Sequence, residues 1–420
     1  MEKIIIRNFG PIENIEFNLD KQFNVVIGEQ ATGKSTLAKC IYFFKDAISV
    51  MSRMLVAQSE KLMNMTAENI LQVYYNSVKN LFYLSFGRYT YNENSKIYYY
   101  YSIERYVEVF VNNGEIQFRY DENTEREIIK ILNAYIKKQK TKVPNDDLFN
   151  LRVWGIFIER LFGNEEKRMF IPACRSRVST IFDTYVGNTN DIYLNILLEN
   201  IRMFKFFMET YSKTDVDVNY LHKENVPFDL HERFADLNLL KRRILKGDYE
   251  SDKDKTWIKL ENGLKVPVEY GSSGQQESLW ILNFLTMIMY SANRRFLIIE
   301  EPEAHLYPSA QFELVKLIAL VINTTDSKVM ITTHSPYILS AFNILTYAGQ
   351  VEKNNKDGII SLSQRIKPQS LSAFKLERGL CRNIYNEKEG LITSEEIDTV
   401  STEMNTLFDR LIDKSCEEMR

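Results

Sequence analysis

The segment that decides the fold reads FNVVIGEQATGKST, residues 23–36. Its first five residues are mostly apolar and β-branched, which predicts a short buried strand. Gly28, Gly33, Lys34 and Ser35 then match the spacing G-x-x-x-x-G-K-[ST]. In this loop the glycines let the backbone wrap around phosphates, and the N–H groups point inward as donors. A helix expected from Lys34 to Phe44 adds its free N–H groups and its dipole to the same place.

The loop therefore predicts a nucleotide site, with a chance glycine-rich turn as the alternative. Lys34 is expected to reach the β- and γ-phosphates, and Ser35 to hold Mg²⁺. The residues expected to contact ATP in this loop are Gly28, Gln30, Thr32, Gly33, Lys34, Ser35 and Thr36. Upstream, residues 12–19 alternate between apolar and polar side chains, which predicts a half-exposed strand. The chain is thus expected to open with a β-hairpin.

Two carboxylates follow a second apolar strand, Phe296 to Ile299, in the stretch RRFLIIEEPEAHLYP. Ligands of open α/β sheets bind at the carboxyl ends of the strands. Glu300 is therefore predicted to position Mg²⁺, and Glu301 to polarise the attacking water as a general base. A solvated acidic turn is the alternative, but Glu-Glu-Pro is unusual at turns, where Gly, Asn, Asp and Ser dominate.

Two further segments complete the candidate site. In YGSSGQQES, the small residues Ser272, Ser273 and Gly274 precede an apolar helix, and free N–H groups at a helix start suit a γ-phosphate. A plain serine N-cap is the alternative. Downstream, an apolar strand over residues 329–331 runs into His334. A lone histidine is more often structural, yet this position suits a sensor of the γ-phosphate.

The order P-loop, SSGQQ, FLIIEEPE, TTHSP resembles the ATP-binding-cassette (ABC) head of ATPases related to the overcoming-lysogenization-defect (OLD) family, RecF and SMC proteins. The spelling EEPEAHLYP resembles most the stand-alone heads of bacterial anti-phage systems such as Septu and PARIS. Transporter cassettes usually show Asp-Glu-Pro with a different continuation. The resemblance covers residues 1–45 and 255–345, and FIPACRSR, residues 170–177, is similar to a less specific family segment.

The resemblance implies a head-to-tail homodimer, or a higher even oligomer, with ATP and Mg²⁺ as cofactors. The P-loop of one chain and the Ser273–Gly274 signature of the other would close on one ATP, with His334 as the switch histidine. Glu300 stands where the family usually has Asp, and no glutamine of the Q-loop type is identified. For Arg175 and Arg177 a surface or phosphate-binding role is left open.

The implied fold is an α/β P-loop ABC-ATPase head, a mixed sheet flanked by helices, with an inserted β-hairpin region and a helical arm. The head is expected over residues 1–45, 165–185 and 255–420, the inserted lobe over 46–164, and the arm, read as helices projecting from the head, over 186–254. Strands over 107–111 and 115–120 flank an Asn-Gly pair typical of a hairpin. A second hairpin is expected over residues 257–268, leading into the signature.

Several polar and aromatic features of the insert are ambiguous. Tyrosines between residues 89 and 106 could stack on nucleobases, although strand residues on a twisted sheet are favoured. The lysines over residues 137–142 fit a solvated helix end better than a DNA grip. Asp215 and Asp217 form a D-x-D pair, which we interpret as solvated acid, so no nuclease centre is predicted in this chain.

In the tail, strands are expected over residues 359–362 and 371–376. A terminal amphipathic helix is expected after Thr393, with an apolar face that packs on the head by default.

Composition excludes some classes of protein. The formal net charge is −3, so DNA contact is expected only through local basic patches. The four cysteines lie far apart and predict reduced thiols in a cytoplasmic protein. The longest apolar run, Leu279 to Tyr290, is shorter than the ~20 residues that span a bilayer, so no membrane association is expected.

The leading hypothesis is an ATPase subunit of an anti-phage defence complex, which would bind ATP and hydrolyse it slowly. It would regulate a separately encoded effector such as a Toprim or HNH nuclease. The second hypothesis is a DNA-repair or DNA-tethering ATPase of the RecF/SMC class. The third is a scaffold in which ATP is a structural ligand that is not hydrolysed.

Overall fold

The computed structural model describes most of the chain, with gaps. The described residues are 2–62, 64–88, 90–139, 157, 160–163, 166–173, 175–176, 178, 190–212, 228–251, 256–291, 293–352, 355 and 358–393. The Asp215/Asp217 pair and the expected terminal helix lie outside them, as do Lys140 and Lys142 of the lysine stretch at 137–142.

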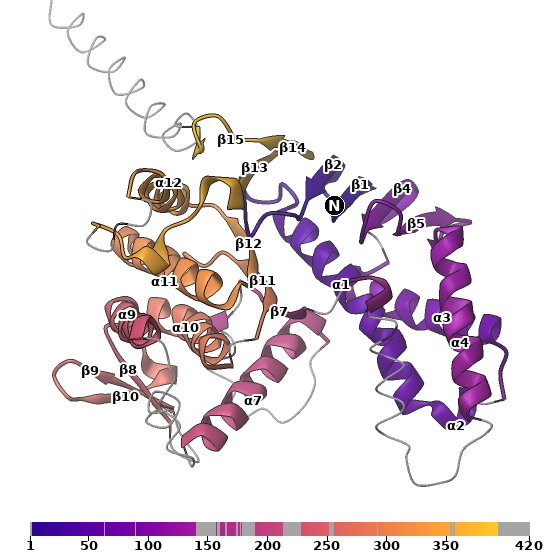
Figure 1. Cartoon of the computed structure of the whole chain (residues 1–420), viewed down its shortest axis with the longest axis horizontal. Coiled ribbons are helices and arrows are strands. Elements are labelled where there is room, and N and C mark those ends of the chain that lie inside the picture. Colours follow the sequence, from indigo (N-terminus) through magenta and orange to yellow (C-terminus); the bar gives the residue numbers. More distant parts are fainter. Residues whose placement is uncertain are drawn as a thin grey trace, which may run out of the picture.

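One eleven-stranded sheet organises the molecule, with the order β6-β5-β4-β1-β2-β14-β13-β3-β12-β11-β7 (Figure 1). Its strands are β1 (Lys3–Phe9), β2 (Ile12–Asn18), β3 (Phe23–Ile27), β4 (Tyr91–Tyr100), β5 (Tyr106–Asn112), β6 (Glu115–Tyr120), β7 (Lys167–Ile171), β11 (Arg295–Glu300), β12 (Lys328–Thr333), β13 (Leu371–Glu377) and β14 (Leu380–Asn383). The run β13-β3-β12-β11-β7 is parallel, whereas β2-β1-β4-β5-β6 is antiparallel. The sheet is therefore mixed, as the resemblance implied.

Helices cover both faces of the parallel strands, and the residues of β3 and β11 are buried at every position. On β3, Val25 packs into one core while its neighbour Val26 packs into the other, as the alternation of side chains along a strand requires. One core holds α1 (Lys34–Ala57), α2 (Ser59–Leu62), α3 (Ala67–Phe86) and α4 (Glu122–Gln139). The other holds α7 (Ile192–Ser212), α9 (Phe228–Leu245), α10 (Ser273–Ser291), α11 (Pro308–Thr325) and α12 (Pro336–Val351). Figure 1 shows the two groups on opposite sides of the sheet.

The strands of the inserted region continue the head's own sheet. β4 pairs antiparallel with β1, with Ile97 opposite Ile6, and β5 and β6 form the hairpin that the Asn-Gly pair predicted. Three strands rather than one hairpin are therefore added. The domain boundaries stay a prediction. β4 is held to the first strand of the chain by backbone pairing, and β5 and β6 join the sheet through β4.

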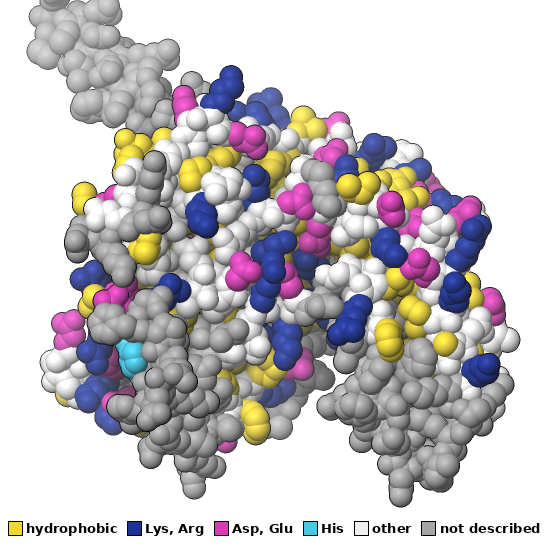
Figure 2. All heavy atoms as spheres, viewed as in Figure 1, with side chains coloured by type: hydrophobic (Ala, Val, Ile, Leu, Met, Phe, Trp, Pro, Cys, Tyr) yellow, Lys and Arg dark blue, Asp and Glu magenta, His cyan; other side chains and the backbone are white. Residues whose placement is uncertain are grey.

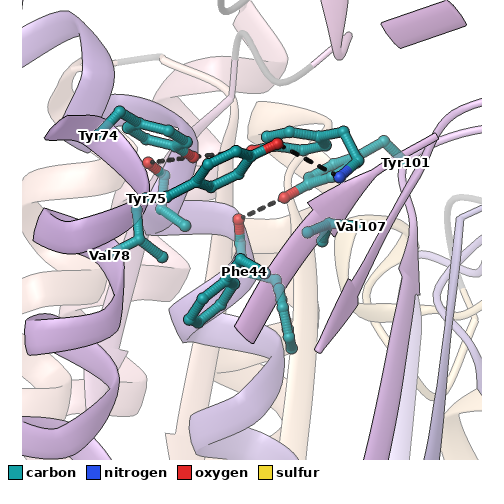
Figure 3. A pocket seen from close by; sticks show the side chains of 9 residues that line it. Phe44, Tyr74, Tyr75, Val78, Tyr101 and Val107 are labelled. Atoms are coloured by element: carbon teal, nitrogen blue, oxygen red, sulfur yellow. Dashed lines mark hydrogen bonds between the residues drawn. The ribbon is translucent and has the colours of Figure 1, made fainter. Parts of the chain in front are cut away.

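Aromatic side chains fill the space between the added strands and the helices α1 and α3. The Tyr74 and Tyr120 hydroxyls lie 2.7 Å apart, and the Tyr101 hydroxyl donates to the Phe44 carbonyl oxygen at 3.0 Å (Figure 3). Tyr99 is fully buried and stacks on Phe44. Because these rings are buried and their hydroxyls are hydrogen-bonded, these four tyrosines form a structural core and present no surface to nucleobases.

The expectation of helices projecting from the head is wrong for the described parts of residues 186–254. Leu197 and Phe204 of α7 and Leu237 of α9 are buried in the same core as α10 and α11. Both helices bury apolar side chains, and α10 is buried at every position from Glu277 to Met289, most of them apolar. Burial against α10 keeps α7 and α9 on the head.

A small sheet leads into α10. It consists of β8 (Gly247–Ser251), β9 (Thr256–Leu260) and β10 (Lys265–Pro267) in the order β10-β9-β8. The hairpin of β9 and β10 confirms the one predicted there, and the 3₁₀ turn η1 (Val268–Tyr270) joins it to the start of α10.

The tail returns to the middle of the sheet. β13 pairs parallel with β3, which confirms the strand expected at residues 371–376. The strand expected at residues 359–362 is wrong: the backbone N–H groups of Ile359 and Ile360 donate to the Glu352 carboxylate. These donors are then not available to a strand partner, and the chain bends into the 3₁₀ turn η2 (Leu362–Gln364). The remaining elements are η3 (Pro368–Ser370), β15 (Tyr385–Asn386) and β16 (Leu391–Ile392).

Charges of both signs are mixed on the surface. On the face in Figure 2, Lys and Arg side chains alternate with Asp and Glu side chains instead of gathering by sign. This agrees with the formal net charge of −3. Within the described part of the chain, no helix is both long and apolar enough to cross a bilayer.

Candidate nucleotide-binding site

Close backbone approach explains the glycines of the loop between β3 and α1. A Cβ on Gly28 would lie 2.3 Å from the Leu376 carbonyl oxygen of β13, so only glycine fits where the tail strand passes the loop. Gly33 has φ +103 and ends the loop as the N-cap of α1, a conformation that residues with a Cβ rarely adopt. The sequence FNVVIGEQATGKST thus forms the predicted strand, loop and helix, and α1 extends well beyond the expected Phe44.

Lys34 is held inside the loop. Its Nζ donates to the carbonyl oxygens of Gly28 at 2.8 Å and Glu29 at 2.7 Å. Burial lowers the pKa of Lys34, and the charges of Glu301, Glu303 and Glu300 oppose that shift. One ammonium and three carboxylates therefore lie close enough at this loop to influence one another.

A cavity of about 200 Å³ opens above the loop. It is lined by Pro11, Gln30, Ala31, Thr32, Gly33, Lys34, Ser35, Thr36, Glu301 and His334. Most of the predicted nucleotide contacts are thus gathered around one space, together with both predicted catalytic residues. Pro11, in the turn between β1 and β2, was not predicted, because nothing in the sequence places that turn beside the loop.

The strand order explains how His334 reaches the site. β12 lies between β3, which carries the loop, and β11, which ends at Glu300. His334 follows β12, and its Nδ1 lies 3.4 Å from Lys34 Nζ while its Nε2 lies 3.0 Å from Glu301 Oε1. The imidazole therefore bridges the ammonium of the loop and the predicted general base.

Glu300 is arranged to hold a cation. The carboxylate is buried, and burial raises its pKa, whereas hydrogen bonds from the Ser35 hydroxyl and the Ala173 backbone act in the opposite direction. Its Oε1 is buried without a hydrogen-bond partner. An orphaned buried carboxylate oxygen beside a serine hydroxyl fits Mg²⁺, which binds through few protein oxygens plus water and phosphate. Among the described residues, no three His, Cys, Asp or Glu side chains form a metal cluster.

Glu301 has an unusual backbone. Its φ is +44, in the left-handed region, and its N–H donates to the Thr332 carbonyl oxygen at 2.8 Å. Non-glycine residues in this region are uncommon and often mark functional sites. The turn carries the carboxylate away from the strand and toward His334, leaving the side chain about one-third exposed.

Glu303 is a site residue that the sequence analysis missed. Its Oε1 accepts hydrogen bonds from the Thr333 hydroxyl and from the His334 backbone N–H, both at 2.7 Å. It therefore ties the loop after β12 to the loop after β11, and so places the histidine. The signal was present as the third carboxylate of EEPE, but its direction cannot be read from spacing.

The predicted signature lies elsewhere on the chain. Ser272 caps α10: its Oγ accepts from the Gln275 N–H at 3.3 Å, and Gln275 Oε1 accepts from the Ser272 N–H at 3.0 Å. This is a capping box, so the N-cap alternative describes Ser272 correctly. A Cβ on Gly274 would lie 2.7 Å from the His305 carbonyl oxygen. Ser272 and Ser273 are exposed, and the segment 272–274 does not line the cavity above the P-loop.

The structure settles the role of Arg175, one of the two arginines after β7 whose roles the sequence left open. Arg175 is completely buried, and its guanidinium donates to backbone carbonyl oxygens, so a surface role or a direct phosphate contact is wrong. Arg177 lies outside the described residues. The segment after β7 also supplies the Ala173 backbone N–H, which donates a hydrogen bond to the Glu300 carboxylate.

The strand, loop and helix at residues 23–36, with buried Glu300 at the end of the apolar strand β11, are the features expected of a P-loop ATPase. A sequence model of the AAA ATPase domain family matches residues 1–339, so the chain belongs to that family. None of the curated proteins matches the chain.

Solved structures show a weak overall likeness. An SMC head bound to the C-winged helix domain of ScpA is 12% identical, with 91% of this chain and 96% of that chain covered and a TM-score of 0.41. The SMC head domain from Thermotoga maritima is 9% identical, with 91% and 97% covered and a TM-score of 0.38. The recombination mediator RecF is 11% identical, with 91% and 97% covered and a TM-score of 0.36.

Proposed function

We propose that two copies of this chain hydrolyse ATP between them in a Mg²⁺-dependent reaction, each copy supplying half of the site. The P-loop, Glu300, Glu301 and His334 of one copy face the exposed start of α10 in the other. Ser273 and Gly274 there offer free N–H groups at a helix N-terminus, which favours binding of the γ-phosphate.

The separation of the two halves within one chain carries this proposal. The cavity above the P-loop is partly open, and its lining includes no residue of the segment 272–274. Ser273 is exposed on another part of the surface and has no role in that cavity. A second copy is the simplest source of the missing wall, because its surface carries the donors that the first cavity lacks.

Mixing two inactive variants tests the paired site. Ser273→Arg blocks the signature half, and Lys34→Ala removes the charge that binds the phosphates. Each variant alone is expected to lack turnover, whereas a mixture restores up to one working site per heterodimer. A mixture of Lys34→Ala with Lys34→Ala,Ser273→Arg is the matched control and stays inactive. Full activity of Ser273→Arg alone contradicts the paired site.

In the proposed reaction, Glu301 accepts a proton from the water that attacks the γ-phosphate. His334 holds Glu301 Oε1 at 3.0 Å and lies beside Lys34, so it orients the base relative to the phosphate charge. Lys34 and the loop N–H groups stabilise the charge on the β- and γ-phosphates. Ser35 and Glu300 would hold Mg²⁺, which neutralises phosphate charge when it is bound. We expect a slow enzyme, because the site forms only when two copies meet.

The biological role that we propose is anti-phage defence in the bacterial cytoplasm, as the ATPase subunit that regulates a separately encoded effector. The support is the spelling EEPEAHLYP over residues 300–308, which resembles stand-alone defence ATPases. Affinity purification of the tagged chain with the products of neighbouring genes tests it, with and without ATP and with Lys34→Ala as the control. Recovery of a Toprim or HNH nuclease that depends on ATP supports defence, and recovery of no partner contradicts it.

A DNA-tethering role in repair is the alternative, because the order of the four motifs also resembles RecF and SMC heads. Binding of duplex DNA with a steep loss of affinity as salt rises, without an effector, favours it.

A further inference from the structure

Arg175 has no exposed surface and lies between the segment after β7 and the first turns of α10. Its Nε donates to the Glu277 carbonyl oxygen at 3.0 Å and lies 3.2 Å from Glu277 Oε2. The other carboxylate oxygen of Glu277 accepts from the Ser176 N–H at 3.1 Å. The start of α10 is thus joined to this arginine by a backbone contact and by an ion pair, both buried.

The other side of the guanidinium binds the end of β11. Nη1 donates to the Glu300 carbonyl oxygen at 2.6 Å, and Nη2 donates to the Glu301 carbonyl oxygen at 2.8 Å. Nη1 also donates to the Pro172 carbonyl oxygen at 2.8 Å. Only a planar group with several fixed donors can span these partners, because an ammonium is a single point of attachment.

The two carbonyl oxygens on β11 belong to the residues that the site depends on. Glu301 adopts φ +44, which residues with a Cβ disfavour, so its backbone must be held by its surroundings. The Thr332 carbonyl oxygen holds its N–H and Arg175 holds its carbonyl. A displacement of Arg175 therefore changes the backbone that aims the Glu301 carboxylate at His334.

On the side away from β11, the contacts of Arg175 lead through Glu277 to the signature residues Ser273 and Gly274. Glu277 follows Ser273 by four residues, so the two lie on one face of α10, one turn apart. A rotation or shift of the helix start moves Glu277 with it. Because the contacts around Arg175 are buried and close-packed, the movement cannot be absorbed there without breaking a hydrogen bond.

We propose that Arg175 is a positioning residue that links the two ATP sites of the pair. Nucleotide bound against Ser273 belongs to the partner copy, whereas Glu301 acts on the nucleotide of its own copy. Arg175 connects these two places within one chain. ATP bound at one site therefore sets the position of the Glu301 base in the other site. The inference rests on the proposed paired site and predicts cooperative hydrolysis.

Arg175→Lys tests the link, because it keeps the positive charge but cannot span Glu277 and the two β11 carbonyls. Arg365→Lys is the matched control: Arg365 is also buried, and its Nε contacts the Glu352 carboxylate at 3.1 Å and the Ile360 carbonyl at 2.8 Å, remote from the cavity. For each protein, turnover is measured against ATP concentration, together with binding of a non-hydrolysable ATP analogue and the melting temperature.

The wild type and Arg365→Lys are expected to show a Hill coefficient between one and two, the number of sites. Arg175→Lys is expected to lose about tenfold to 100-fold in kcat, as for a misplaced catalytic group, with a Hill coefficient of one and with analogue binding retained. If Arg175→Lys does not fold, Glu277→Gln takes its place and is expected to lower kcat and the Hill coefficient in the same direction, by less.

A Hill coefficient of one in the wild type overturns the proposal. So does a variant that loses kcat and thermal stability but keeps the wild-type Hill coefficient, since that is a purely structural role. Restoration of turnover on mixing Ser273→Arg with Lys34→Ala is independent of Arg175. If mixing restores activity and the Arg175→Lys enzyme stays cooperative, the paired site stands and only the link fails.

Discussion

His334 Nε2 lies 3.0 Å from Glu301 Oε1, although the two residues end different strands of the sheet. The contact exists because β11 and β12 are parallel neighbours, so that their carboxyl ends lie side by side. The Glu303 carboxylate fixes the His334 backbone at the same edge. Together these contacts hold the Glu301 carboxylate and the His334 ring in a fixed arrangement at the end of the two strands.

Glu301→Gln is expected to lower kcat by about 10²-fold to 10⁴-fold, the typical contribution of general acid–base catalysis. Affinity for ATP is expected to stay unchanged, because the amide has the same size and Lys34 is untouched. Phosphate release and equilibrium binding of labelled ATP measure the two quantities. Glu313→Gln, on α11 and ion-paired with Lys316, is the control with wild-type turnover. Wild-type turnover in Glu301→Gln would mean that another group acts as the base, whereas a wild-type protein that binds ATP without turnover would be a scaffold with structural ATP.

His334→Ala separates a functional histidine from a structural one. Removing the ring breaks the connection between Lys34 and Glu301, so kcat is expected to fall about tenfold to 100-fold. The side chain is about one-third exposed, so little stability should be lost. Turnover and the urea midpoint are compared in the same buffer. A large drop in the urea midpoint with normal kcat per folded molecule contradicts a role in catalysis.

Gly28→Ala is expected to destabilise the fold by about 1–3 kcal/mol, as overpacking does. The new Cβ would lie 2.3 Å from the Leu376 carbonyl oxygen, which is backbone and cannot rotate away. Either the P-loop or β13 must move, so affinity for ATP is expected to fall as well. Urea unfolding with nucleotide titration measures both effects. An unchanged free energy of unfolding shows that β13 does not press on the loop.

Asp46 predicts a pH dependence of stability. Burial raises its pKa, but the hydrogen bond from Arg53 and the charges of Arg168 and Arg53 outweigh burial, and the pKa is held below its ordinary value. The native carboxylate therefore stabilises the fold above the unfolded pKa of about 3.9 and loses this effect as pH falls through the lower native pKa.

Asp46→Asn is accordingly expected to lower the free energy of unfolding by about 2–4 kcal/mol, because it breaks a buried pair. The deficit relative to the wild type should be equal at pH 7 and at about pH 5, and smaller below about pH 4. Urea unfolding at the three pH values checks this. A deficit that already shrinks between pH 7 and pH 5 contradicts a lowered native pKa.

Much of the site could be predicted from local sequence. Lys34, Glu300, Glu301 and His334 each follow an apolar run that ends in polar residues, and parallel strands bring such ends to one edge. Ser272 showed the limit of this reasoning, since a serine before a helix can cap it or bind a ligand, and it caps α10. The expected strand at residues 359–362 failed because a carboxylate of Glu352 took its backbone donors.

The sequence by itself determined the strand, loop and helix at residues 23–36, the buried character of the parallel strands and the family of the chain, because these depend on neighbouring residues. Tertiary structure decided that β12 separates β3 from β11, that β4 extends the sheet from β1, and that Arg175 joins α10 to Glu301. Those facts depend on hydrogen bonds between residues far apart in the chain, and periodicity carries no information on which distant partner a buried donor meets.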